Sequence, residues 1–113
     1  MDNNIRKYSF NNEQEAKELL ADSRIKIDEI DNKLFDLICE RTSLAQEIAL
    51  AKNYLGMDVY DKEREKIIQR KTHELAEGRD IDVDIMDQIM NMLTILSKNK
   101  QKEILRSVEN GKY

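Results

Sequence analysis

The feature that most constrains this chain is a long stretch without proline or glycine. Nothing breaks a helix from Asn12 to Asn53, and Glu15 follows Asn12 at the spacing of a capping box. About forty helical residues extend for roughly 60 Å, whereas a compact domain of about 100 residues has a radius of gyration near 13 Å. Such a helix extends beyond its own fold and needs a partner chain to cover it. A two-fold copy is the simplest partner, so we expect an obligate homodimer.

Two shorter helices are predicted after this one. Gly56, within "YLGMD", ends the first helix. The second helix begins at about Asp61, a candidate N-cap, and ends at Glu77, before a stop at Gly78. The third helix follows the capping residues in "RDID" and continues to about Val108, before the fraying end "NGKY". The chain is therefore predicted to be all-α, with three helices and a very long first one.

The composition of the 113 residues supports this fold and limits the classes of function. Charged residues make up 37% and aromatic residues 5%, with no proline, which favours helices in a single domain. The net charge of −4 argues against non-specific nucleic-acid binding. "MDNNIRKYSFNN" is not a signal peptide, and no apolar run approaches the roughly 20 residues of a membrane span. We expect a cytoplasmic protein with a flexible N-terminal arm, residues 1–11, and a helical domain, residues 12–109.

Charged and polar residues interrupt the apolar stripes of these helices. The first helix has a stripe with steps of three and four, made of Ile27, Ile30, Leu34, Leu37, Leu44, Ile48 and Ala51. Arg24 precedes this stripe, Arg41 falls inside it and Lys52 lies on its edge. In the third helix, Ser97 and Gln101 continue a stripe that begins with Met86, Met90 and Leu93.

Cations on core-facing stripes need partners, because a buried unpaired charge is unfavourable. One such arginine is ordinarily salt-bridged, or it extends its charged end to water. Several of them, together with Ser97 and Gln101, favour a pocket for an anion that the chain does not supply. Protein carboxylates as the counterions are the alternative at this point.

The ordered set of these residues resembles the all-helical chorismate mutases, the AroQ class, from about Leu19 to Leu105. The resemblance rests on "RIKIDEIDNKLFDLICER", the lysine at position 52, "VYDKERE" at residues 59–65, and the serine and glutamine of the third helix. Each motif is weak alone, and the ordered set is specific. It implies an intertwined homodimer and, since nothing suggests an attached domain, a stand-alone mutase.

The resemblance implies an isomerase that converts chorismate to prephenate, in the shikimate pathway toward phenylalanine and tyrosine, without a cofactor or metal. Arg24 matches an arginine donated to the partner's site, where it contacts a substrate carboxylate. Arg41 matches the arginine that binds the other carboxylate within its own chain. Lys52 matches the lysine that contacts both a carboxylate and the ether oxygen. Gln101 matches the second ether-oxygen donor, and Ser97 a residue that holds the ring carboxylate.

The segment "VYDKERE" is implied to form one wall of the site. The backbone of Asp61 helps to hold the substrate hydroxyl, and Glu65 accepts a hydrogen bond from it. Arg64 matches a further cation near a carboxylate, whereas Lys62 and Glu63 are interpreted as surface charges. The expected catalytic residues are Lys52, Gln101, Arg41 and Glu65.

Two other functions are compatible with the same residues. An isochorismate-pyruvate lyase has the same fold and a similar cationic pocket. A non-catalytic regulatory or scaffold dimer is the alternative from another class, and docking of an active mutase on another shikimate-pathway enzyme is a further possibility. His73 and Cys39 each occur alone in the chain, so neither a metal site nor a Cys–His pair has support. The helix pattern predicts a small core residue at Cys39 and a solvent-facing side chain at His73.

Overall fold

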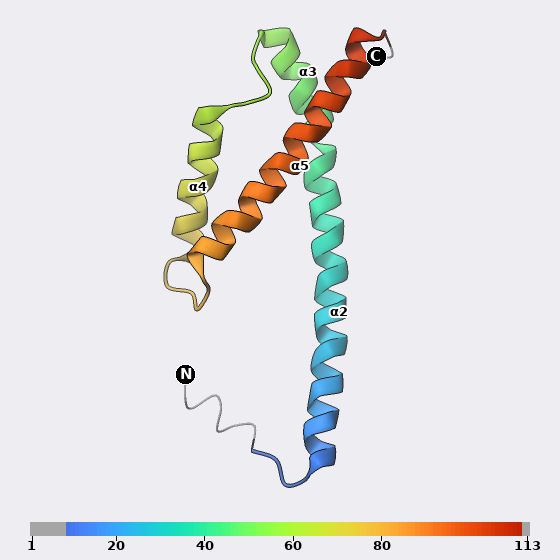
Figure 1. Ribbon diagram of the computed structural model, residues 1–113, viewed down its shortest axis with the longest axis vertical. Helices are drawn as coiled ribbons and strands as arrows, with labels where there is room; N and C mark the ends of the chain where they lie inside the picture. The colour runs from blue at the N-terminus through green and yellow to red at the C-terminus, as the bar shows by residue number, and fades with distance from the viewer. Residues whose placement is uncertain (1–8, 112–113) are drawn as a thin grey trace. The chain divides into compact units, whose positions relative to one another are not determined.

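The computed structural model describes residues 9–111, and all structural statements below concern this part of the chain. Its regular elements are α-helices, and it contains no strand. Figure 1 shows them as α2 (Glu13–Ser43), α3 (Ala45–Leu55), α4 (Lys62–Ala76) and α5 (Val83–Glu109). The prediction of an all-helical chain with a very long first helix is confirmed.

The predicted first helix corresponds to α2 and α3, which are separated by Leu44 alone. Leu44 keeps right-handed helical backbone angles, with φ −66° and ψ −15°. Its N–H donates to the carbonyl of Arg41 at 3.3 Å. This is the i→i−3 spacing of a 3₁₀ turn rather than the i→i−4 spacing of an α-helix. The hydroxyl of Ser43 donates to the carbonyl of Glu40 at 2.6 Å, and such side-chain bonds compete with the regular ladder. The chain thus continues helically through one irregular turn.

The first turn of α2 is capped close to the predicted position. The N–H of Glu15 donates to Oδ1 of Asn12 at 2.9 Å, as a capping box requires. The carboxylate of Glu15 accepts from the N–H of Asn11 at 3.0 Å instead of from the N–H of Asn12. The reciprocal bond is therefore shifted by one residue. Of the predicted N-terminal arm, residues 1–8 lie outside the described residues.

The predicted boundaries of the other helices agree with the structure to within two residues. Asp61 caps α4 by accepting from the N–H of Arg64 at 3.1 Å. Asp82 caps α5 in the same way. Gly56 and Gly78 have φ values of 70° and 73°, which favour glycine because it lacks a Cβ atom. They follow α3 and α4 respectively and let the chain leave each helix.

The structure consists of two compact units, residues up to Leu37 and residues from Ile38. In the second unit, α5 packs against both α3 and α4 (Figure 1). Its buried side chains are few, comprising Ala45, Ala49, Thr72, Gln101 and Ile104. This packing brings one face of α5 opposite two other helices, which is the arrangement that forms the site described below.

The first unit contains most of α2, a helix with no buried residue. The apolar stripe predicted there is exposed in this chain, with exposed fractions of 54%, 54%, 50% and 60% for Ile27, Ile30, Leu34 and Leu37. Cys39, just beyond this unit, is also exposed, so the prediction of a small core residue is wrong for the single chain. No helix in residues 9–111 is long and apolar enough to cross a membrane.

Candidate active site

A cavity of about 360 Å³ in the second unit collects most of the predicted site residues. Seven of the eight predicted substrate-binding side chains line it: Arg41, Lys52, Asp61, Arg64, Glu65, Ser97 and Gln101. They come from the end of α2, from α3, from α4 with its N-cap, and from α5. The eighth, Arg24, is an exposed residue of the first unit.

Lys52 is half-buried and held by two acceptors. Its Nζ atom donates to the carbonyl of Val59 at 2.8 Å and to Oε1 of Gln101 at 3.0 Å. A lysine ammonium carries three N–H donors and no acceptor. The third N–H of Lys52 is therefore available to a ligand in the cavity.

Gln101 is 4% exposed, and both ends of its amide are engaged. Because lysine can only donate, the amide oxygen faces Lys52, and the amide nitrogen donates to Oγ of Ser97 at 3.1 Å. A chain of hydrogen bonds thus runs from Val59 through Lys52 and Gln101 to Ser97. It leaves the hydroxyl proton of Ser97 and the second amide N–H of Gln101 for a bound anion.

Three cations of the cavity have no carboxylate partner among residues 9–111. Arg41 is half-buried and donates from Nη1 to the carbonyl of Leu93 at 3.1 Å. Arg64 is exposed. Within residues 9–111, no carboxylate forms an ion pair with Arg41, Lys52 or Arg64. Among the described residues, this removes the alternative that protein carboxylates neutralise these three cations.

The two carboxylates of the cavity, Asp61 and Glu65, make different contacts within the protein. The side chain of Asp61 caps α4 through the N–H of Arg64. Glu65 forms an ion pair with Lys98, in which Oε2 lies 3.1 Å from Nζ. Both side chains of this pair are largely withdrawn from water, at 23% exposed for Lys98 and 27% for Glu65. The charge of Glu65 is therefore balanced by Lys98, a residue that was not predicted to belong to the site.

Lys98 and Thr94 are the polar lining residues that sequence reasoning missed. One face of α5 carries all four polar lining residues of this helix, because Ser97, Lys98 and Gln101 lie three, four and seven residues after Thr94. Only Ser97 and Gln101 were selected as interruptions of an apolar stripe. Thr94 and Lys98 lie four residues apart on the same face, so the helical spacing could also have identified them.

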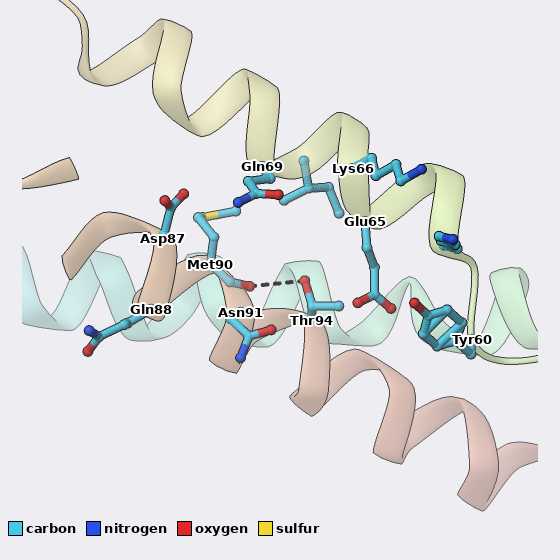
Figure 2. A pocket seen from close by; sticks show the side chains of 11 residues that line it. Tyr60, Glu65, Lys66, Gln69, Asp87, Gln88, Met90, Asn91 and Thr94 are labelled. Carbon is cyan, nitrogen blue, oxygen red and sulfur yellow. Dashed lines mark hydrogen bonds between the residues drawn. The ribbon is translucent and has the colours of Figure 1, made fainter. Parts of the chain in front are cut away.

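A second cavity of about 460 Å³ adjoins the first and lies between α4 and α5. Figure 2 shows the side chain of Glu65 reaching from α4 toward Thr94 and Tyr60 at one end of it. Glu65 and Thr94 line both cavities. The second cavity is larger, but its lining mixes Lys62 and Lys66 with carboxylates and amides. We therefore place the anion site in the first cavity, where the unpaired cations lie.

His73 does not line the first cavity, and its side chain is exposed, as the helix pattern predicted. It is exposed but not free, because its Nε2 atom lies 2.6 Å from Oδ2 of Asp87 on α5. In residues 9–111, no group of three or more His, Cys, Asp or Glu side chains is placed to hold a metal ion. The cavity itself presents cations, neutral hydrogen-bond donors and the carboxylates of Asp61 and Glu65.

Comparisons with known proteins give a family for this arrangement. The pattern of the family described as Chorismate mutase type II matches residues 23–102, which include all eight predicted site residues. A curated chorismate mutase from Methanocaldococcus jannaschii is 43% identical over 93 residues, covering 82% of this chain and 94% of that protein. No solved structure matches the chain. With a family match over most of its length and a relative of this identity, the chain belongs to the chorismate mutase type II family.

Proposed function

We propose that this chain catalyses the rearrangement of chorismate to prephenate. The observation that carries this proposal is the set of three cations, Arg41, Lys52 and Arg64, which face one cavity without a carboxylate partner among the described residues. A dicarboxylate substrate supplies carboxylate partners for these three cations. The neutral donors Ser97 and Gln101 add hydrogen bonds to the same ligand.

Binding by these residues restricts the conformation of a flexible dianion. The planar guanidinium groups of Arg41 and Arg64 grip carboxylates at fixed angles, and the hydroxyl of Ser97 adds a donor for the ring carboxylate. A pericyclic rearrangement requires the two reacting ends of the substrate to approach each other. Holding them in that compact conformer lowers the barrier without a nucleophile or a general base.

The second contribution is electrostatic stabilisation of the ether oxygen. Negative charge builds on this atom as the C–O bond lengthens. Lys52 has one N–H without an acceptor among the described residues, and the amide of Gln101 lies beside it with a second N–H. Donors fixed in advance around such an atom favour the transition state over the ground state, and one of them contributes about 3 kcal/mol. Lys52 and Gln101 are assigned this role.

The hydroxyl of the substrate is held at the other wall of the cavity. We assign Glu65, which lines the cavity, as the acceptor of its hydrogen bond, and the backbone of Asp61 at the start of the same helix as a second contact. The ion pair between Glu65 and Lys98 supports this assignment, because it keeps an acceptor-only carboxylate inside a cavity that binds an anion.

A second copy of this chain completes the site in our proposal. The exposed stripe from Ile27 to Leu37 gives α2 a long apolar surface, which water contacts unfavourably. A two-fold partner that offers the same stripe covers both surfaces at once. Arg24 lies three residues before Ile27 on the same helix face. We assign it to the partner's cavity, where it binds a substrate carboxylate in an intertwined dimer.

The proposed activity is tested by following chorismate with the purified chain. Ultraviolet absorbance reports the loss of chorismate, and chromatography identifies prephenate as the product. A parallel incubation uses isochorismate, from which a lyase releases salicylate and pyruvate. Prephenate formation supports the proposal. Release of salicylate and pyruvate without mutase activity would assign the cavity to the lyase reaction, and a folded chain that converts neither compound would exclude both enzymes.

A further inference from the structure

We propose that Lys98 is a positioning residue for Glu65, which it holds on the substrate side of the wall between the two cavities. This inference rests on the function proposed above, because it concerns the same cavity. Nζ of Lys98 lies 3.1 Å from Oε2 of Glu65, and less than a third of either side chain is exposed. The bond joins α5 to α4.

Glu65 needs such a partner because it borders two spaces. Its side chain lines both the candidate substrate cavity and the adjoining one, and Figure 2 shows the adjoining one. A glutamate has several rotatable bonds and broad freedom at the last of them, so its backbone position alone does not decide which space the carboxylate serves. Lys98 lines the substrate cavity and not the adjoining one. The ion pair therefore fixes the carboxylate where the substrate hydroxyl is to bind.

Lys98 is itself held from a second direction by Tyr60. Its Nζ atom lies 5.3 Å from the centre of the Tyr60 ring, within the range of a cation–π interaction. Tyr60 directly precedes Asp61, the N-cap of α4. Lys98 thus connects the start of α4 to the carboxylate of Glu65 one turn later, and Tyr60 becomes part of the same support.

The charge of Lys98 also matters to a cavity that receives a dianion. A carboxylate without a partner there would repel both carboxylates of the substrate. With Lys98 beside it, Glu65 contributes little net charge. It still has lone pairs for a hydroxyl donor, since an ionised carboxylate accepts about four hydrogen bonds. Lys98 therefore lets Glu65 accept a hydrogen bond from the substrate hydroxyl without repelling the substrate carboxylates.

The test is a double-mutant cycle measured with chorismate. Lys98→Met removes the ammonium while keeping an unbranched chain, and we expect kcat/KM to fall about tenfold in the wild-type background. In the Glu65→Gln background, the same substitution should change kcat/KM by less than about twofold, because no carboxylate remains to be held. Lys98→Arg, which retains the charge, should restore most of the loss. Lys100→Met is the matched control, since Lys100 lies on the same helix, lines neither cavity and pairs with Glu103.

The outcomes separate this inference from the proposed function. Wild-type turnover is measured first, and its absence would overturn the proposed function together with the role of Lys98. If the wild type is active, equal losses from Lys98→Met in both backgrounds would assign Lys98 a role independent of Glu65. No loss in either background would equally overturn the inference. Tyr60→Leu provides a second variant if Lys98→Met does not fold, and it should lower kcat/KM only where Lys98 and Glu65 are both present.

Discussion

Nζ of Lys52 lies 3.0 Å from Oε1 of Gln101, so one charge-assisted hydrogen bond joins α3 to α5 inside the cavity. The bond connects the two residues that we assign to the ether oxygen of the substrate. Since the amide oxygen is committed to Lys52, the amide N–H groups point elsewhere, one of them to Ser97. The pair therefore presents donors from both residues while no acceptor from either competes for the ligand.

Replacement of Lys52 by alanine should lower kcat by at least about a hundredfold, because a preorganised donor to the developing charge contributes about 3 kcal/mol. The variant also loses the bonds to Val59 and Gln101, so its folding must be checked. Steady-state rates with chorismate measure the first effect, and thermal unfolding followed by circular dichroism measures the second. A folded Lys52→Ala protein with near-normal turnover would contradict the electrostatic mechanism.

Replacement of Gln101 by leucine should lower kcat about ten- to a hundredfold. Leucine has a similar volume but no donor, and it leaves Lys52 without one acceptor and Ser97 without one donor. Ser97→Ala is the companion variant, because it removes a carboxylate contact while leaving the bond between Lys52 and Gln101. It should raise KM more than it lowers kcat. Equal effects of the two variants on kcat would show that Gln101 acts only as part of the hydrogen-bond chain.

Helix ends and the positions of site residues were predictable because they depend on local rules. Asp61 and Asp82 cap their helices with short carboxylates, and Gly56 allows the positive φ that ends α3. Arg41 and Lys52 stood out because a helical period placed them on or beside an apolar stripe. The resemblance then joined residues of separate helices into one site. The structure brings seven of those eight residues to one cavity, and their roles toward a substrate stay predictions.

Features that depend on packing between helices were not predictable in the same way. Lys98 looks like a surface charge in the sequence, and its pairing with Glu65 depends on how α5 meets α4. The irregular turn at Leu44 lies next to a hydroxyl bond from Ser43 to the backbone, a kind of bond that a count of helix breakers ignores. Cys39 was assigned to a core by periodicity, although the single chain leaves it exposed. A stripe on a helix shows that a surface needs cover, but it does not show which chain provides it.

Replacement of Leu34 by aspartate should convert the proposed dimer into monomers. Leu34 is half-exposed in the single chain and lies in the middle of the apolar stripe of α2. In a two-fold dimer the substitution buries two carboxylates without partners, at an effective penalty of several kcal/mol for each. Sedimentation at matched concentrations measures the mass. The control is Lys33→Asp, which introduces the same group at the neighbouring exposed position. Unchanged mass for Leu34→Asp, or a monomeric wild type, would contradict this interface.

Mixing two inactive variants tests whether the site is shared between chains. Arg24→Ala removes the arginine proposed to enter the partner's cavity, and Arg41→Ala removes one that lines the chain's own cavity. In a heterodimer, the cavity of the Arg24→Ala chain keeps its own Arg41 and receives an intact Arg24 from the partner. The other cavity lacks both. Random reassortment of equal amounts makes half of the dimers mixed, so about one quarter of all cavities should regain both arginines.

The expected result is recovery to about a quarter of the wild-type rate per chain after the two variants are unfolded together and refolded. Native mass spectrometry, with one variant carrying a short tag, measures the fraction of mixed dimers. Each variant refolded alone provides the baseline, since its cavities all lack one arginine. Mixed dimers that form in the expected proportion but stay at this baseline would place Arg24 outside the partner's site. Recovery in proportion to the mixed fraction requires that each working cavity draws on both chains, because no single chain in the mixture carries both arginines.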